Sequence, residues 1–218
     1  MPACAAGNGV AMIKEFLPYD VVRNDALKIA YKLYHDDGFI PDVIYCSLRG
    51  GASMANVISE YYKIVRKDHH PVLYAAVVAR SYTDVRQASP RVYVDGWTYP
   101  PANLRPGDRI MLVDDIFDSG HTINALVDIL LDYGVPRENV KVVVHDYKVF
   151  TYKEPLPIQP DSWCRKIVVS RPEEDRWIHY MSHELVGLSR TEFEKNYVCE
   201  DDVMRKVLED IAGGSEHA

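Results

Sequence analysis

The stretch that decides the fold runs from Ile110 to Thr122 and reads IMLVDDIFDSGHT. Four apolar residues, Ile110–Val113, predict a buried strand, and two acids, Asp114 and Asp115, follow at its carboxyl end. A third acid, Asp118, precedes a loop of small residues that opens an apolar helical pattern. A strand, a turn and a helix in this order are typical of one half of a βαβ unit.

The loop after this strand has the features of a phosphate site. In an open parallel sheet, ligands bind beyond the carboxyl ends of the strands. Backbone N–H groups would converge at the start of the helix, where the helix dipole also favours an anion. The residues concerned are Ser119, Gly120, His121 and Thr122. The preceding acids could hold ribose hydroxyls or a water-bound cation, so a sugar phosphate fits both halves of the stretch.

Similar patterns continue on both sides of this stretch. Apolar residues recur at helical spacing from Asp20 to Tyr34 and from about Ala52 to Val65, and short apolar strands are predicted at Val43–Cys46 and Val140–His145. A nearly continuous apolar run, Pro71–Ala79, is typical of a strand covered on both faces. Strands that alternate with helices predict an α/β fold with a mostly parallel twisted sheet flanked by helices.

Polar segments rich in proline interrupt this alternation. The segment from Ser81 to Arg105 is polar and aromatic, and we expect a lid or a hairpin excursion with a short strand at Arg91–Val94. After Tyr147 the pattern loosens. Three further elements are expected there: a strand at Lys166–Ser170, a helix from Ser189 with a capping box to Glu192, and a helix at Asp202–Ile211.

Composition places the chain among globular proteins. Its 218 residues predict one domain over residues 13–218, preceded by a flexible tail at residues 1–12. The formal net charge of −7 argues against a general nucleic-acid binder, and no apolar run approaches the roughly 20 residues that span a bilayer. The four scattered cysteines and the absence of a secretory signal predict a cytoplasmic protein with free thiols.

The stretch Ile110–Thr122 resembles the phosphoribosyl pyrophosphate (PRPP) motif of type I phosphoribosyltransferases. The likeness is to the 6-oxopurine branch, which acts on hypoxanthine, guanine or xanthine, and it extends from about Val43 to Arg190. It implies the type I phosphoribosyltransferase fold, with a flexible lid loop and a base-binding hood mainly at residues 148–190. It also implies that Asp114 and Asp115 contact the ribose hydroxyls, that Asp118 accepts the purine proton, and that the loop after Asp118 holds the 5′-phosphate.

Two other segments resemble parts of the same family. Ser47–Gly51 reads SLRGG between a strand and a helix, and its glycines and Arg49 independently predict a second anion site. It is similar to the family's pyrophosphate loop, in which Arg49 and Gly50 would bind and the peptide equivalent to Arg49–Gly50 is often cis. Ser81 and Tyr82 correspond to a Ser-Tyr pair that closes over the reacting centre.

Base recognition is expected after His145. The resemblance implies that Lys148 donates to the purine 6-oxygen, with Lys153 as the rival, and that Trp177 stacks on the purine while the backbone near Ile178 reads its edge. By the same resemblance, Glu184 joins Asp114 and Asp115 in holding Mg²⁺, and Arg190 reaches the pyrophosphate. The Pro-Trp-acid of bacterial and archaeal hoods is replaced here by Met181-Ser182-His183-Glu184.

The resemblance therefore implies a Mg²⁺-dependent purine phosphoribosyltransferase of purine salvage. Such an enzyme transfers the 5-phosphoribosyl group from PRPP to a 6-oxopurine and releases a nucleoside 5′-monophosphate and pyrophosphate. Its partners would be PRPP and the base, without nucleic acid or membrane, in a homo-oligomer (dimer or tetramer) by analogy with the family. Two alternatives stay open: a PRPP-binding regulatory protein of the same fold, and a phosphoribosyltransferase for another nucleobase.

Overall fold

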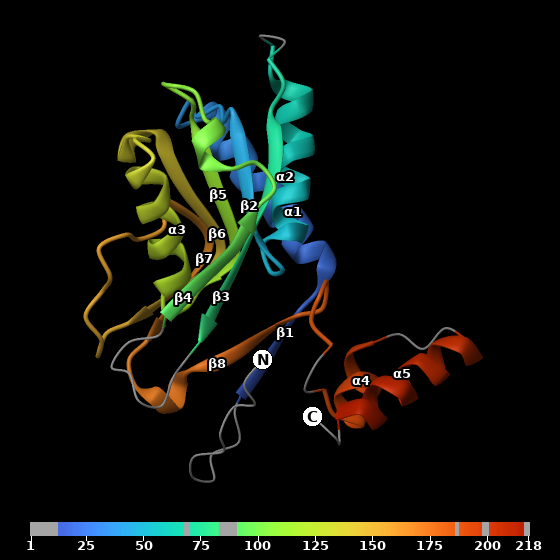
Figure 1. Ribbon diagram of the computed structural model, residues 1–218. Coiled ribbons are helices and arrows are strands. Elements are labelled where there is room, and N and C mark those ends of the chain that lie inside the picture. Colours follow the sequence, from blue (N-terminus) through green and yellow to red (C-terminus); the bar gives the residue numbers. More distant parts are fainter. Residues whose placement is uncertain (1–12, 68–69, 83–90, 186–187, 198–200, 216–218) are drawn as a thin grey trace. The chain divides into compact units, whose positions relative to one another are not determined.

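The computed structural model describes residues 13–67, 70–82, 91–185, 188–197 and 201–215 (Figure 1). The predicted tail at residues 1–12 and part of the predicted lid segment, residues 83–90, lie outside the described residues, as do the side chains of Ser81 and Tyr82. Contacts divide the chain into two compact units, a larger one at residues 20–174 and a smaller one that joins residues 1–19 to residues 175–218. The expected hood at residues 148–190 thus falls partly in each unit, and the prediction of a single domain stays a prediction.

The larger unit is built on a six-stranded sheet with the order β4-β3-β2-β5-β6-β7 (Figure 1). Every neighbouring pair is parallel except β3 and β4, which are antiparallel. The strands are β2 (Val43–Leu48), β3 (Leu73–Tyr82), β4 (Arg91–Trp97), β5 (Ile110–Phe117), β6 (Val140–Phe150) and β7 (Ser162–Val169). The predicted α/β fold with a mostly parallel sheet is confirmed.

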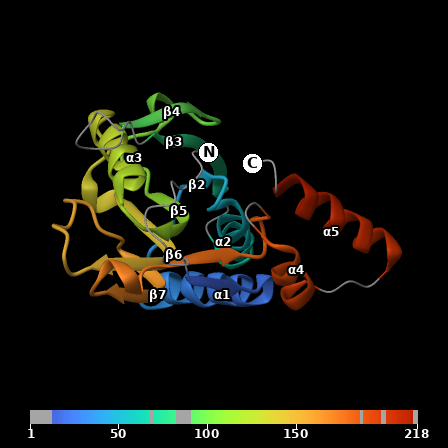
Figure 2. The ribbon, with the colours of Figure 1, turned by 90° about the horizontal axis from the view of Figure 1, so that it is seen from below.

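Three helices cover this sheet, α1 (Tyr19–His35), α2 (Ala52–Val65) and α3 (His121–Asp132). Helix α3 lies on one face, and α1 and α2 lie on the other (Figure 2). Successive side chains of a strand point to opposite faces, and both faces of the central strands are covered. The first four residues of β2 and of β5 are therefore all apolar. Short 3₁₀ turns complete the unit at Pro101–Asn103, Arg137–Asn139 and Pro172–Glu174.

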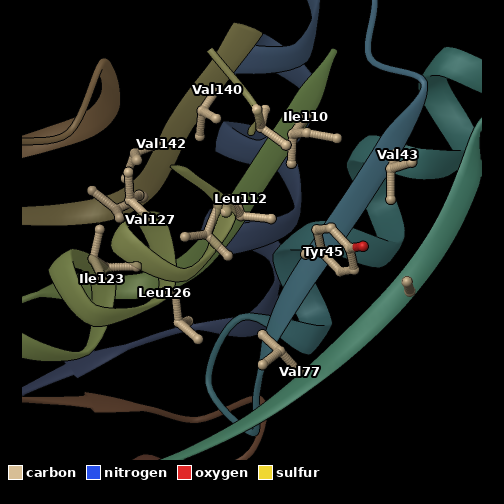
Figure 3. Packing of buried hydrophobic residues seen from close by; sticks show 14 of the residues in the cluster. Val43, Tyr45, Val77, Ile110, Leu112, Ile123, Leu126, Val127, Val140 and Val142 are labelled. Carbon is tan, nitrogen blue, oxygen red and sulfur yellow. The ribbon is translucent and has the colours of Figure 1, made fainter. Parts of the chain in front are cut away.

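The main core lies between the sheet and α3. Ile123, Leu126 and Val127 of α3 point toward Leu112 of β5 and Val142 of β6, and all five side chains are buried (Figure 3). This apolar stripe on α3 recurs at the helical spacing that the sequence predicts. Packing at this interface therefore fixes where α3 begins, immediately after the loop that follows β5.

Several predicted strand boundaries were wrong, and so was the prediction that both faces of β3 are covered. Strand β5 continues through both acids to Phe117, and β6 continues past His145 to Phe150, so Lys148 lies inside a strand. Strand β7 starts at Ser162, ahead of the expected residue. One face of β3 is partly open, with Tyr74 40% exposed, because this strand lies next to the sheet edge.

The smaller unit joins the two ends of the chain. Strands β1 (Ile13–Leu17) and β8 (Arg176–Tyr180) pair in parallel, and neither strand was predicted. Helix α4 (Arg190–Asn196) begins with the predicted capping box, in which Ser189 and Glu192 exchange hydrogen bonds. Helix α5 (Asp202–Ser215) follows. None of the described helices is both long and apolar enough to span a membrane.

Candidate active site

Two neighbouring carboxylates lie near the end of β5. Asp114 is buried, and its Oδ1 accepts a hydrogen bond from the backbone N–H of Asp115 at 3.0 Å. Asp115 Oδ1 accepts in turn from Ile116 N–H at 2.8 Å. Burial raises the pKa of Asp114 well above its ordinary value, and the adjacent charge of Asp115 raises it further. The pair is therefore suited to a cation or to hydroxyl donors that favour its ionised form.

The predicted pyrophosphate loop lies directly against this pair. A Cβ built on Gly50 would meet the Asp115 carboxyl at 2.3 Å, and one on Gly51 would meet the Val113 carbonyl oxygen at 2.4 Å. Only glycine permits this approach of loop and strand. The cis peptide bond of this loop is Leu48–Arg49, one residue before the expected Arg49–Gly50 peptide. Arg49 itself is exposed, so its guanidinium is accessible to a ligand.

The predicted 5′-phosphate loop leads into α3. Gly120 precedes the first helical residue with a φ of 78°, and a Cβ at this position would meet the Phe117 ring at 2.3 Å. Helix α3 begins at His121, and Gly120 before it has no side chain that could accept hydrogen bonds from the backbone N–H groups of the first turn. The start of α3 therefore offers N–H donors and the positive end of a helix dipole to an anion.

Asp118 and Lys148 meet at the end of two adjacent strands, β5 and β6. Lys148 Nζ lies 3.6 Å from Asp118 Oδ1, and Lys148 is only 6% exposed while the Asp118 side chain is half-exposed. Lys153, the rival for base recognition, instead has its Nζ 3.9 Å from the centre of the Phe150 ring. The structure thus brings Lys148, rather than Lys153, to the predicted catalytic acid.

The other predicted residues lie in the smaller unit. Trp177 on β8 is 42% exposed, whereas the neighbouring Ile178 is buried. Glu184 Oε2 accepts from the Tyr180 backbone N–H at 3.0 Å, and Arg190 at the start of α4 has its Nε 3.1 Å from Glu194. An exposed indole is available for stacking, while the Glu184 carboxylate already closes the turn after β8.

The donor set of the larger unit fits a magnesium ion that the substrate helps to hold. Within the described ranges, no group of three or more His, Cys, Asp or Glu residues could hold a metal by itself. Mg²⁺ in phosphate sites commonly uses only one or two carboxylates, with waters and substrate oxygens as its other ligands. Asp114 and Asp115 provide such a pair beside the Gly50 contact.

Sequence reasoning missed two residues that support this site. Ser47 is buried next to the acid pair, and hydrogen bonding from its hydroxyl lowers the pKa of the Asp114 carboxyl. Asn124 of α3 donates from Nδ2 to the Gly120 carbonyl at 3.0 Å and to the Ile158 carbonyl at 2.9 Å. A polar residue within an otherwise apolar strand or helix face was the available signal for both, because a buried polar group needs a partner.

The chain is similar to a known family and to curated proteins over most of its length. Residues 19–156 match the phosphoribosyl transferase domain. The bifunctional protein PyrR of Roseiflexus sp. (strain RS-1) is 28% identical over 176 residues, which cover 80% of this chain and 90% of that protein. The bifunctional protein PyrR of Halalkalibacterium halodurans is 25% identical over 167 residues, which cover 75% of this chain and 88% of that protein.

Two solved structures share the fold. The purine phosphoribosyltransferase of Pyrococcus horikoshii aligns with a TM-score of 0.58 at 19% identity, over 79% of this chain and 95% of that one. The hypoxanthine phosphoribosyltransferase of Staphylococcus aureus aligns with a TM-score of 0.53 at 16% identity, over 73% of this chain and 77% of that one. With a family match over more than half of its length, the chain belongs to the phosphoribosyltransferase family.

Proposed function

We propose that this phosphoribosyltransferase transfers the 5-phosphoribosyl group of PRPP to a 6-oxopurine base. The observation that carries the proposal is the meeting of Lys148 and Asp118 beside the acid pair of β5. An ammonium group can only donate hydrogen bonds, so Lys148 suits a carbonyl oxygen and disfavours the amino group of adenine. A carboxylate at the same place suits the proton of an oxopurine imidazole.

Each part of the larger unit has a role in this reaction. Purine N9 attacks C1 of PRPP, the bond from C1 to the pyrophosphate oxygen breaks, and Asp118 accepts the proton that the purine loses. Asp114 and Asp115 orient the ribose hydroxyls, and residues 119–122 hold the 5′-phosphate. Arg49 and the backbone at Gly50 stabilise the negative charge of the departing pyrophosphate.

Magnesium and the remaining predicted residues complete the proposal. When bound beside Asp114 and Asp115, Mg²⁺ supplies positive charge that offsets the charge of the pyrophosphate. We further propose that Trp177 stacks on the base with the Ile178 backbone at its edge, and that Glu184 and Arg190 assist at the cation and the pyrophosphate. The lid role of Ser81 and Tyr82, the cytoplasmic location and the homo-oligomer stay predictions.

A second candidate function is supported by the curated relatives. Proteins named bifunctional protein PyrR match most of this chain, and the word bifunctional assigns them more than one role. A second role is compatible with the alternatives that the sequence leaves open, a PRPP-binding regulatory protein of the same fold or a phosphoribosyltransferase for a different nucleobase. Asp118 is present and the net charge is −7, which favours the enzyme over a regulator that binds nucleic acid.

Pyrophosphate release separates these candidates. The purified chain is incubated with PRPP and Mg²⁺ and with hypoxanthine, guanine, xanthine, adenine or uracil in turn. We expect release with at least one 6-oxopurine and little with adenine. Release with uracil alone would replace the purine proposal by a pyrimidine enzyme, and PRPP binding without release for any base would support the regulatory protein.

A further inference from the structure

Ser47 lies between the two halves of the proposed PRPP site. It is the penultimate residue of β2, and Cys46 before it pairs with Val113 of β5. Continuing this parallel register by one residue brings Ser47 beside Asp114. Ser47 is only 4% exposed, and it is a polar residue that follows four apolar residues of β2. A buried hydroxyl in this position is costly unless a polar group satisfies it.

The backbone carbonyl and the side-chain hydroxyl of Ser47 have different partners. Its carbonyl oxygen accepts a hydrogen bond from the Gly51 backbone N–H at 2.9 Å, which closes the loop of residues 47–51. Its hydroxyl is on the same face of the sheet as the Asp114 side chain, because paired residues of parallel strands share a face. Hydrogen bonding from this hydroxyl lowers the pKa of the Asp114 carboxyl, against the effect of burial. A Cβ on Gly51 would come within 3.0 Å of both the Ser47 carbonyl oxygen and Asp114 Cα, so loop and acid are packed together at this point.

We infer that Ser47 is a positioning residue that holds the Asp114 carboxylate in the orientation that accepts a ribose hydroxyl of PRPP. A carboxylate that accepts from Asp115 N–H and has the buried Ser47 hydroxyl beside it cannot rotate freely, and it keeps lone pairs for a ligand. Because Ser47 also closes the neighbouring loop, one residue fixes both the ribose acid and the loop proposed for the pyrophosphate. This inference rests on the proposed function.

The test is direct binding of PRPP in the presence of Mg²⁺, measured by calorimetry without any base. We expect Ser47→Ala to raise the Kd for PRPP roughly tenfold, which is the scale of one hydrogen bond to a charged group. In steady state the KM for PRPP should rise while kcat changes by less than about twofold, because ribose contacts hold substrate and transition state alike. Ser47→Thr, which keeps the hydroxyl, should restore most of the affinity.

The matched control is Ser162→Ala, which removes another buried serine hydroxyl at the amino end of β7, away from the site. It should leave the Kd for PRPP unchanged. If Ser47→Ala does not fold, Ser47→Cys provides a side chain of similar size with a weaker donor, and its Kd for PRPP should also rise. A wild-type protein that binds PRPP, with Ser47→Ala binding within about twofold of it, would overturn the inference. A wild-type protein that does not bind PRPP would instead contradict the proposed function.

Discussion

The segments at the ends of β2 and β5 are each continuous in sequence, whereas the paired strands of the smaller unit come from opposite ends of the chain. In the larger unit, the candidate site comes from short continuous segments, residues 47–51 and 114–122, each next to an apolar strand. In the smaller unit, Ile13 pairs with Arg176, so its sheet joins segments separated by most of the chain. Local motifs thus carry the proposed phosphate chemistry, whereas the proposed hood residues depend on a long-range pairing.

The largest expected effect is at Asp118. Asp118→Asn keeps the shape of the side chain and removes the proton acceptor, so kcat should fall by roughly 10²–10⁴-fold, the usual range for general acid–base roles. PRPP affinity should change little, because in the proposed reaction Asp118 contacts the base and not PRPP. Steady-state pyrophosphate release and PRPP calorimetry measure the two quantities. Near-normal turnover, or abolished PRPP binding, would mean that Asp118 is not the catalytic acid.

The next largest effect concerns the close approach of Gly50, in the loop after β2, to Asp115 of β5. Gly50→Ala would place a methyl group 2.3 Å from the Asp115 carboxyl and force the loop and the acid apart. We expect kcat/KM for PRPP to fall by about 10²-fold, the scale of a displacement of about 1 Å at a reacting centre. Gly96→Ala is the control, because a Cβ there meets nothing within 4 Å. Equal kcat/KM values for the two variants would contradict a close-packed site.

A smaller effect is expected at Lys148. Lys148→Met removes the donor but keeps the length of the side chain, and the KM for a 6-oxopurine should rise roughly 10–100-fold, as expected for a lost hydrogen bond from a charged group. The KM for PRPP should stay near its original value. Lys153→Met removes the charge above Phe150 and should alter both constants by less than about twofold. A larger rise in the KM for the 6-oxopurine with Lys153→Met than with Lys148→Met would mean that Lys153, and not Lys148, recognises the base.

The smallest effect is on the stability of the smaller unit. Burial lowers the pKa of His179, whose Nε2 lies 3.3 Å from the Tyr197 hydroxyl. In the unfolded chain, His179 takes up a proton below about pH 6.5, its ordinary pKa, whereas in the folded state burial keeps it neutral to a lower pH. The free energy of unfolding therefore falls as the pH drops from about 6.5 toward the lowered pKa of the folded state. Thermal unfolding between pH 7.5 and about pH 5 should show a declining Tm. His179→Gln should flatten this decline, and identical slopes would rule out His179 as its source.

Sequence predicted the parts of the fold that depend on neighbouring residues. Helical spacing located α1, α2 and α3, and the change from apolar strand to small-residue loop located the start of α3. The capping box at Ser189 was also predicted, since it requires residues only three positions apart. These features are local because backbone hydrogen bonds and helix-capping contacts join residues close in sequence.

What depends on distant contacts was not predicted. The pairing of β1 with β8 cannot be inferred from five-residue segments of mixed polarity. Strand β6 extends to Phe150 because β7 continues to pair with it, and this places Lys148 at Asp118. Ser47 and the open face of β3 likewise depend on which element lies beside them, which periodicity does not reveal.

Identification of the product tests the proposed transfer to a 6-oxopurine. The chain is incubated with PRPP, Mg²⁺ and hypoxanthine, guanine or xanthine in turn, and each mixture is analysed by mass spectrometry together with a pyrophosphate assay. We predict that at least one of these bases gives its nucleoside 5′-monophosphate in equal amount to pyrophosphate in the wild type, and that this product is nearly absent with Asp118→Asn. A wild-type chain that binds PRPP but forms no such product from hypoxanthine, guanine or xanthine would contradict this prediction.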